Sequence, residues 1–379
     1  MPWPRTTLRA LFAAAVLVAS ATHAVCGDIR VGFINPGMVG EAFWLQVSAT
    51  MQAAAAQLGI DLDIRYTRRD YDKALVLADE LLSQRPPLDY LIATNDIGAG
   101  GPIVKRADAA GVPVLLLSND LDQKDWAEFG EPRTKYRNWL GSIVPDHEGG
   151  GYGIAESILS EAARLKSTRP LRLLALAGDS ETPANNDRVR GLRRALDVMR
   201  DLLGRGSVDL VAIANLDWTE KTAETWVRQF VSAKDHPRID AVWAVNDPTA
   251  FGAITALREA GYKPGADVVV GGLNWSQGGV QRVLAGDMFL THGGHFLGGA
   301  WAMVILRDYH DGRDFAEEDV RLQFPMGAID LPIARRFPDL GKIDWRRVDF
   351  TRFSKTRNPA VTRYNFTPDA VMSALAKTP

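Results

Sequence analysis

From Asp28 onward, short apolar runs rich in β-branched residues alternate with longer stretches whose apolar positions recur at helical spacing. In the first half, the pattern predicts strands over Ile29–Ile34, Leu62–Tyr66, Tyr90–Thr94 and Val112–Leu117, and helices over Phe43–Leu58, Tyr71–Ser83 and Ile103–Ala110. Gly59 ends the first of these helices, and Pro86-Pro87 follows the second. Each apolar run is short enough for a strand that is buried on both faces.

The second half repeats the scheme. The expected strands are Leu171–Ala177, Val208–Ala214, Ala241–Val245 and Val268–Gly272, and the expected helices lie around Asn186–Leu203, Glu220–Ala233, Thr249–Ala260 and Gly278–Ala285. Strands that alternate with amphipathic helices predict parallel sheets covered on both faces. We therefore expect an α/β protein with two doubly wound, parallel-sheet lobes.

Most of these predicted strands end in an amide or a carboxylate. The polar positions are Asn35, Asn95-Asp96, Asn119-Asp120, Gly178-Asp179, Asn215 to Asp217, Asn246-Asp247 and Asn274. In open α/β sheets, ligands bind in the crevice outside the carboxyl ends of the strands. If both lobes present that edge to one cleft, the cleft is a polar cup. The alternative for each single residue is helix capping, because Asn and Asp before a helix accept its free N–H groups.

The N-terminus has the pattern of a secretory signal. A short basic head containing Arg5 and Arg9 precedes an apolar run from Ala10 to Ala19 and a small-residue stretch that ends at Ala24. We expect residues 1–24 to be removed on export to the periplasm. A membrane anchor is the alternative, although the run is shorter than the roughly 20 residues of a spanning helix. A lipid anchor on Cys26 is a second alternative.

Cysteine content and charge narrow the range of partners. Cys26 is the only cysteine, so an intrachain disulfide cannot form and stability must come from packing. The net charge of the whole chain is −2, and loss of Arg5 and Arg9 makes it more negative. A mildly acidic chain without a basic stripe argues against nucleic acid as a partner.

The sequence offers little support for catalysis. It contains no Gly-x-Ser-x-Gly elbow and no Gly-x-x-x-x-Gly-Lys loop, and its glycine clusters lack dinucleotide-binding spacing. His292 and His295 have no third metal ligand nearby in the sequence. We therefore expect a protein that is not an enzyme and that has no cofactor or metal. A repressor with this fold would need a DNA-binding helix-turn-helix where this chain has the export signal.

Several segments resemble periplasmic binding proteins of the type I class, which include ribose-binding proteins and autoinducer-2 receptors. The segments are Val31–Trp44, Asn119-Asp120, Asn185–Gly191, Asp217-Trp218, Asn246–Ala253, Gly271–Asn274 and His292. The resemblance implies a two-lobed clamp for a sugar or sugar-like ligand, with three chain crossings between the lobes near Gly141–Asp146, Thr291–Gly294 and Gln323–Gly327. It also implies a membrane partner, either the permease of an ABC importer or a sensor protein.

Combined with the strand-end pattern, the resemblance indicates twelve ligand-binding residues. They are Asn35, Phe43, Trp44, Asn95, Asn119, Asp120, Arg188, Trp218, Asn246, Asp247, Asn274 and His292. Aromatic rings suit the apolar face of a sugar, and a guanidinium can bridge two vicinal hydroxyls. Each has a structural alternative: Phe43 and Trp44 as helix core, Arg188 as a solvated residue and His292 as a packing residue.

The crossings give a domain plan in which the N-terminal lobe comprises residues 25–143 and 293–323, and the C-terminal lobe residues 144–292 and 324–345. Residues 346–379 form a C-terminal tail. The segment from Leu331 to Pro379 holds ten Lys or Arg against four Asp. This basic segment is either a docking surface for a membrane partner or a solvated wrap over one lobe.

Overall fold

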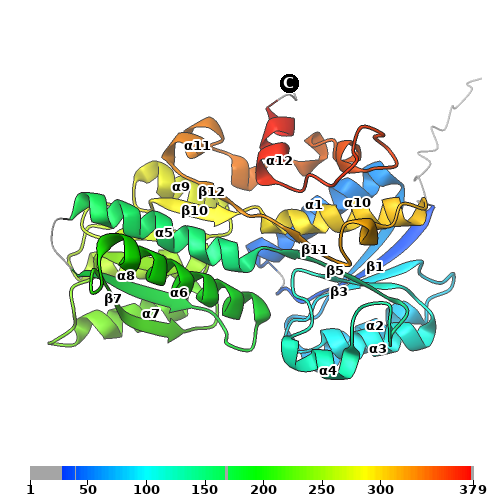
Figure 1. The fold of residues 1–379 in the computed structure, drawn as a ribbon, viewed down its shortest axis with the longest axis horizontal. Helices are drawn as coiled ribbons and strands as arrows, with labels where there is room; N and C mark the ends of the chain where they lie inside the picture. The colour runs from blue at the N-terminus through cyan, green and yellow to red at the C-terminus, as the bar shows by residue number, and fades with distance from the viewer. Residues whose placement is uncertain (1–27, 39, 167–169, 377–379) are drawn as a thin grey trace, which may run out of the picture.

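The computed structural model describes residues 28–38, 40–166 and 170–376, and these fold into two α/β lobes that lie side by side (Figure 1). The strand order is β11-β5-β4-β3-β1-β2 in one sheet and β12-β10-β9-β8-β6-β7 in the other. All paired strands are parallel except β10 and β12, which are antiparallel. The prediction of two doubly wound lobes is confirmed. Residues 1–24 and Cys26, on which the export and lipid-anchor hypotheses rest, lie outside the described residues.

The first lobe has a helical layer on each face of its sheet. Its elements are β1 (Ile29–Asn35), α1 (Ala42–Leu58), β2 (Ile60–Tyr66), α2 (Tyr71–Leu82), β3 (Tyr90–Ala93), α3 (Gly100–Ala110), β4 (Val114–Leu117), α4 (Trp126–Phe129), β5 (Trp139–Pro145), α10 (Gly298–His310) and β11 (Arg321–Phe324). Helices α1 and α10 bury their apolar side chains on one face, and α2 and α3 bury theirs on the other. Gly59 adopts the left-handed conformation that ends α1, as its sequence position predicts.

The second lobe repeats this plan. Its elements are α5 (His147–Leu165), β6 (Leu171–Ala177), α6 (Pro183–Leu203), β7 (Val208–Asn215), α7 (Glu220–Ser232), β8 (Ala241–Ala244), α8 (Asp247–Glu259), β9 (Val269–Leu273), α9 (Gln277–Ala285), β10 (Leu290–Gly293), β12 (Gly327–Ile329) and α11 (Leu331–Arg336). Helices α5 and α6 cover one face of the sheet, and α7, α8 and α9 pack in the core on the other.

The chain passes between the sheets three times. It leaves β5 at Pro145 and begins α5 at His147, leaves β10 at Gly293 and enters α10, and runs from Phe324 in β11 to Gly327 in β12. The crossings lie side by side in the middle of the molecule (Figure 1). They fall within the segments that the sequence indicated. Helices α5 and α10, which flank two of the crossings, were not among the helices expected from the pattern.

The C-terminal segment, which follows α11, is packed mainly onto the first lobe. Trp301 of α10 lies against the rings of Phe350, Phe353 and Phe366. The carboxylate of Asp308, fully buried on the same helix, accepts hydrogen bonds from several groups of this segment, among them Ser354 Oγ at 2.6 Å, Lys355 N at 2.8 Å and Tyr364 OH at 3.1 Å. Residues 345–374 are therefore part of the fold, and a truncation there would remove core.

Helices α5 and α6 approach closely because glycines face each other at their contact. A Cβ added to Gly151 would collide with the backbone carbonyl of Arg188, and one added to Gly191 would collide with that of Glu148. This contact places the first turns of α6 beside α5.

We predict that Gly151→Ala lowers the free energy of unfolding by about 1–3 kcal/mol, because the new methyl group forces the two backbones apart. Urea unfolding followed by circular dichroism measures the change. Ser160→Ala, at an exposed position of the same helix, should leave stability unchanged or slightly raised. Equal stability of Gly151→Ala and the parent would contradict the close helix contact.

Candidate ligand-binding site

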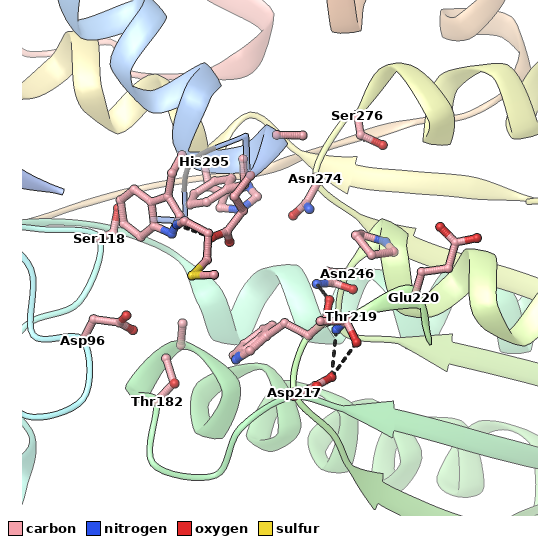
Figure 2. A pocket seen from close by; sticks show the side chains of 18 of the residues that line it. Asp96, Ser118, Thr182, Asp217, Thr219, Glu220, Asn246, Asn274, Ser276 and His295 are labelled. Atoms are coloured by element: carbon pink, nitrogen blue, oxygen red, sulfur yellow. Dashed lines mark hydrogen bonds between the residues drawn. The ribbon is translucent and has the colours of Figure 1, made fainter. Parts of the chain in front are cut away.

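The carboxyl ends of both sheets face one cavity of about 560 Å³. Its wall includes residues from the segment after every strand from β1 to β10. In Figure 2, Asp96 lies on the side of the first lobe, while Asp217, Asn246 and Asn274 project from strand ends of the second. A cavity of this size suits a small ligand. The wall therefore brings together side chains from both lobes around one space.

Strained backbone accompanies the cavity wall. Ser118, Trp218 and Trp275 have φ values of 67°, 71° and 54°, and each follows the carboxyl end of a strand. A positive φ is uncommon outside glycine, asparagine and aspartate, and such residues cluster at ligand sites. Ser118 and Trp218 line the cavity.

Aromatic rings form two parts of the wall. On α1, Phe43 stacks on His295 with ring centroids 4.4 Å apart, and it meets Trp44 edge to face at 5.0 Å. Across the cavity, the indole of Trp218 lies so close to Gly178 that any side chain there would collide with it. The Arg188 guanidinium lies 5.7 Å from the centroid of the Trp218 ring. Flat apolar surfaces thus come from both lobes.

The polar part of the wall links the lobes directly. Ala184 N, at the start of α6, donates to the Asn119 side-chain carbonyl at 3.1 Å. His147 Nε2 donates to the backbone carbonyl of Ser118 at 3.0 Å, which assigns the proton to that nitrogen. His147 Nδ1 is then free to accept from Arg188 Nη2 at 3.3 Å. Arg188 Nη1 donates to Val245 O at 3.1 Å.

A second charged group lies on the first lobe. The Arg69 guanidinium donates to both carboxylate oxygens of Glu41 at 2.7 Å, and its Nε lies 3.6 Å from Asp96 Oδ2. Burial raises the pKa of Asp96 to about 6, and the charge of Arg69 partly opposes that shift. Asp96 Oδ2 has no hydrogen-bond partner among the described residues.

Seven of the twelve predicted residues line the cavity: Phe43, Trp44, Asn119, Arg188, Trp218, Asn246 and Asn274. The other five do not, and each has structural partners. Asn35 bonds Ser48 and the Gly37 amide, Asn95 accepts from Gly100 N at the start of α3, and Asp120 pairs with Arg321 and Ser142. Asp247 accepts from Ser276 and Thr291, and His292 packs against Gly153 of α5.

Several wall residues were not among the twelve, notably Glu41, Arg69, Asp96, His147 and His295. The Asn-Asp pairs after the strands were a useful signal, but the sequence does not show which member of a pair faces the cavity, since Asn246 both caps α8 and lines the cavity. In the Asn95-Asp96 pair, the Asn95 side chain accepts from Gly100 N at the start of α3, and Asp96 lines the cavity. In the His292-Gly-Gly-His295 segment, the second histidine lines the wall. Among the described residues, no cluster of three or more His, Cys, Asp or Glu could hold a metal ion.

Burial keeps three histidines in or behind the cavity wall neutral. It lowers the pKa of His147 to about 3, with the charge of Arg188 acting in the same direction, and it lowers the pKa of His292 to about 4. Burial lowers the pKa of His295 well below its ordinary value.

These shifts predict an acid-labile fold. Between the folded-state pKa values and 6.5, the unfolded chain binds more protons than the folded chain, so stability is lost as the pH falls. Asp96 and Asp247, whose pKa values burial raises to about 6, act in the opposite direction between 3.8 and 6. We therefore predict that His147→Gln reduces the loss of melting temperature between pH 7 and pH 5. An unchanged pH dependence would show that His147 is not held neutral.

Comparisons with known proteins agree with this architecture. A model of the periplasmic binding protein domain matches residues 31–314. The chain is 23% identical over 269 residues to the galactofuranose-binding protein YtfQ of Escherichia coli strain K12, covering 70% of this chain and 77% of that protein. It is 25% identical over 250 residues to the ribose import binding protein RbsB of the same strain, covering 66% and 74% of the two chains.

Solved structures have the same fold. A periplasmic sugar-binding protein from Pseudomonas fluorescens superposes with a TM-score of 0.79 at 32% identity, covering 90% of this chain and 99% of that chain. A galactofuranose-binding protein superposes with a TM-score of 0.70 at 19% identity, covering 83% and 99%. No helix within the described residues is long and apolar enough to cross a membrane. With its family model, its two sheets and its shared cleft, the chain belongs to the periplasmic binding protein family.

Proposed function

We propose that this protein is a periplasmic solute-binding protein that closes on a sugar or sugar-like ligand and delivers it to an ABC importer. The observation that carries the proposal is the cavity between the lobes, whose wall combines aromatic rings with amides and a buried arginine. A sugar has an apolar C–H face and a hydroxylated rim, so it needs both kinds of surface.

The seven predicted residues on the cavity wall divide by chemistry. Phe43, Trp44 and Trp218 offer rings for stacking, while Asn119, Arg188, Asn246 and Asn274 offer hydrogen bonds. Asn246 Nδ2 donates to the backbone carbonyl of Trp218 at 2.9 Å, which ties the strand end of β8 to that ring. In this proposal, the other five predicted residues do not contact the ligand and support the wall through their structural partners. They are Asn35, Asn95, Asp120, Asp247 and His292.

Closure follows from the three crossings. A ligand that contacts both lobes binds the closed arrangement more tightly than the open one, so it shifts the population toward closure. Gly293 and Gly294 lie at one crossing, and Gly294 has a φ of 85°, which favours glycine. The relatives named for ribose import and galactofuranose binding support a transport role over the alternative of a receptor for a membrane sensor.

A thermal-shift screen of the exported protein against pentoses, hexoses, polyols and sugar acids tests the proposal. A ligand at 100 times its Kd stabilises the folded state by about 2.7 kcal/mol, which raises the melting temperature by several degrees. Arg188→Ala and Asn246→Ala should each weaken that ligand at least tenfold. Arg193→Ala, at an exposed position of α6, is the matched control. A ligand whose binding is unaffected by both cavity substitutions would place its site elsewhere.

A further inference from the structure

Two arginines line the cavity, and their surroundings differ. Arg69 faces two carboxylates, those of Glu41 and Asp96. Arg188 is 4% exposed and has no ion pair with any described carboxylate. Burial lowers the pKa of Arg188, and its neighbour Asp187 opposes that shift but pairs with Arg190 at 2.5 Å. Within the part of the chain that the structure describes, Arg188 is thus a buried cation without a paired carboxylate.

The hydrogen bonds of Arg188 are also incomplete. A guanidinium has five N–H groups, and the structure gives partners to two of its nitrogens, Val245 O for Nη1 and His147 Nδ1 for Nη2. Nε has no acceptor among the described residues. Both acceptors that are present are neutral. A buried charge with this set of partners carries a large desolvation cost that a bound anion would offset.

The groups around Arg188 do not supply the missing charge. Asn119, Asn246 and Asn274, which come from the strand ends of β4, β8 and β9, line the cavity with amides. The carboxylate of Asp217 accepts from Thr219 and Thr222, and that of Asp247 accepts from Ser276 and Thr291. These two acids are therefore turned to their own partners.

We propose that the natural ligand is a polyhydroxylated molecule with one carboxylate, of the uronic or aldonic acid class, and that its carboxylate binds Arg188. The inference rests on the proposed function and narrows its ligand. A carboxylate matches the planar guanidinium with two parallel hydrogen bonds, which a single hydroxyl cannot do. The hydroxylated part of the ligand would then lie among the amides and the aromatic rings.

The other charges of the wall disfavour a doubly charged anion more strongly than a singly charged one. Glu41, Asp96, Asp217 and Glu220 line the same cavity, against only Arg69 and Arg188. A phosphate group, with about two negative charges at neutral pH, would meet repulsion from these acids. The structure therefore favours a sugar carboxylate over a sugar phosphate.

Isothermal titration of the exported protein with matched pairs tests the inference. The pairs are D-glucose and D-glucuronate, D-galactose and D-galacturonate, and D-ribose and D-ribonate, with D-glucose 6-phosphate as the doubly charged probe. In at least one pair, we expect the acid to bind ten or more times more tightly than its neutral partner. Arg188→Gln should reduce that ratio to near one, and Arg193→Gln should preserve it.

The outcomes separate the two proposals. If every neutral sugar that binds does so as tightly as its acid, or the phosphate binds more tightly than every carboxylate, the carboxylate inference fails while the proposed function stands. If neither the neutral sugars nor the acids bind, both fail. The comparison within each pair uses the parent protein, so it holds even if Arg188→Gln folds poorly. Melting of the unliganded variant checks its folding.

Discussion

The three crossings of the chain between the sheets are the constraint on which the site depends. They join β5 to α5, β10 to α10 and β11 to β12, and so hold the carboxyl ends of both sheets against one cavity. Two hydrogen bonds between the lobes, from Ala184 N to Asn119 and from His147 to Ser118 O, lie at the wall of that cavity. Without this arrangement, each lobe would present only half of a binding surface.

The C-terminal segment adds a further link between the lobes. Gln46 of α1 donates to Gly341 O at 3.0 Å and accepts from the Trp345 indole at 2.7 Å. A few residues earlier, Pro338 O accepts from Gln281 of α9, in the other lobe. The segment thus contacts both lobes before it packs onto α10. The exposed cations of this segment, such as Arg346 and Arg352, lie on a packed scaffold and not on a free tail.

The fold was predictable because its signal is periodic and repeated. Buried apolar runs and amphipathic helices recur along the chain, and most predicted bounds lie within a few residues of the observed ones. Helix α5 was missed because Gly149, Gly150, Gly151 and Gly153 weaken helix propensity. The structure explains two of them, because Gly151 packs against α6 and Gly153 against His292 of β10. Close packing between elements cannot be read from local propensity.

The site was predictable in outline and less so in detail. Strand-end polar residues and family-like motifs indicated Trp44, Arg188 and Asn246, which line the cavity. The sequence could not show which member of each Asn-Asp pair faces the cavity, so Asn95 was favoured over Asp96. Arg69 was missed because it lies three residues beyond the end of β2, in a stretch that carries no strand-end amide or acid, where it has a φ of 55° and pairs with Glu41.

The most direct test of this account is a crystal structure of the protein with a ligand found by the thermal-shift screen. The account predicts that the ligand lies between the lobes, with a ring face on Phe43, Trp44 or Trp218 and a polar group within hydrogen-bond distance of Arg188. A ligand bound outside this cavity, or one that contacts a single lobe only, would contradict it.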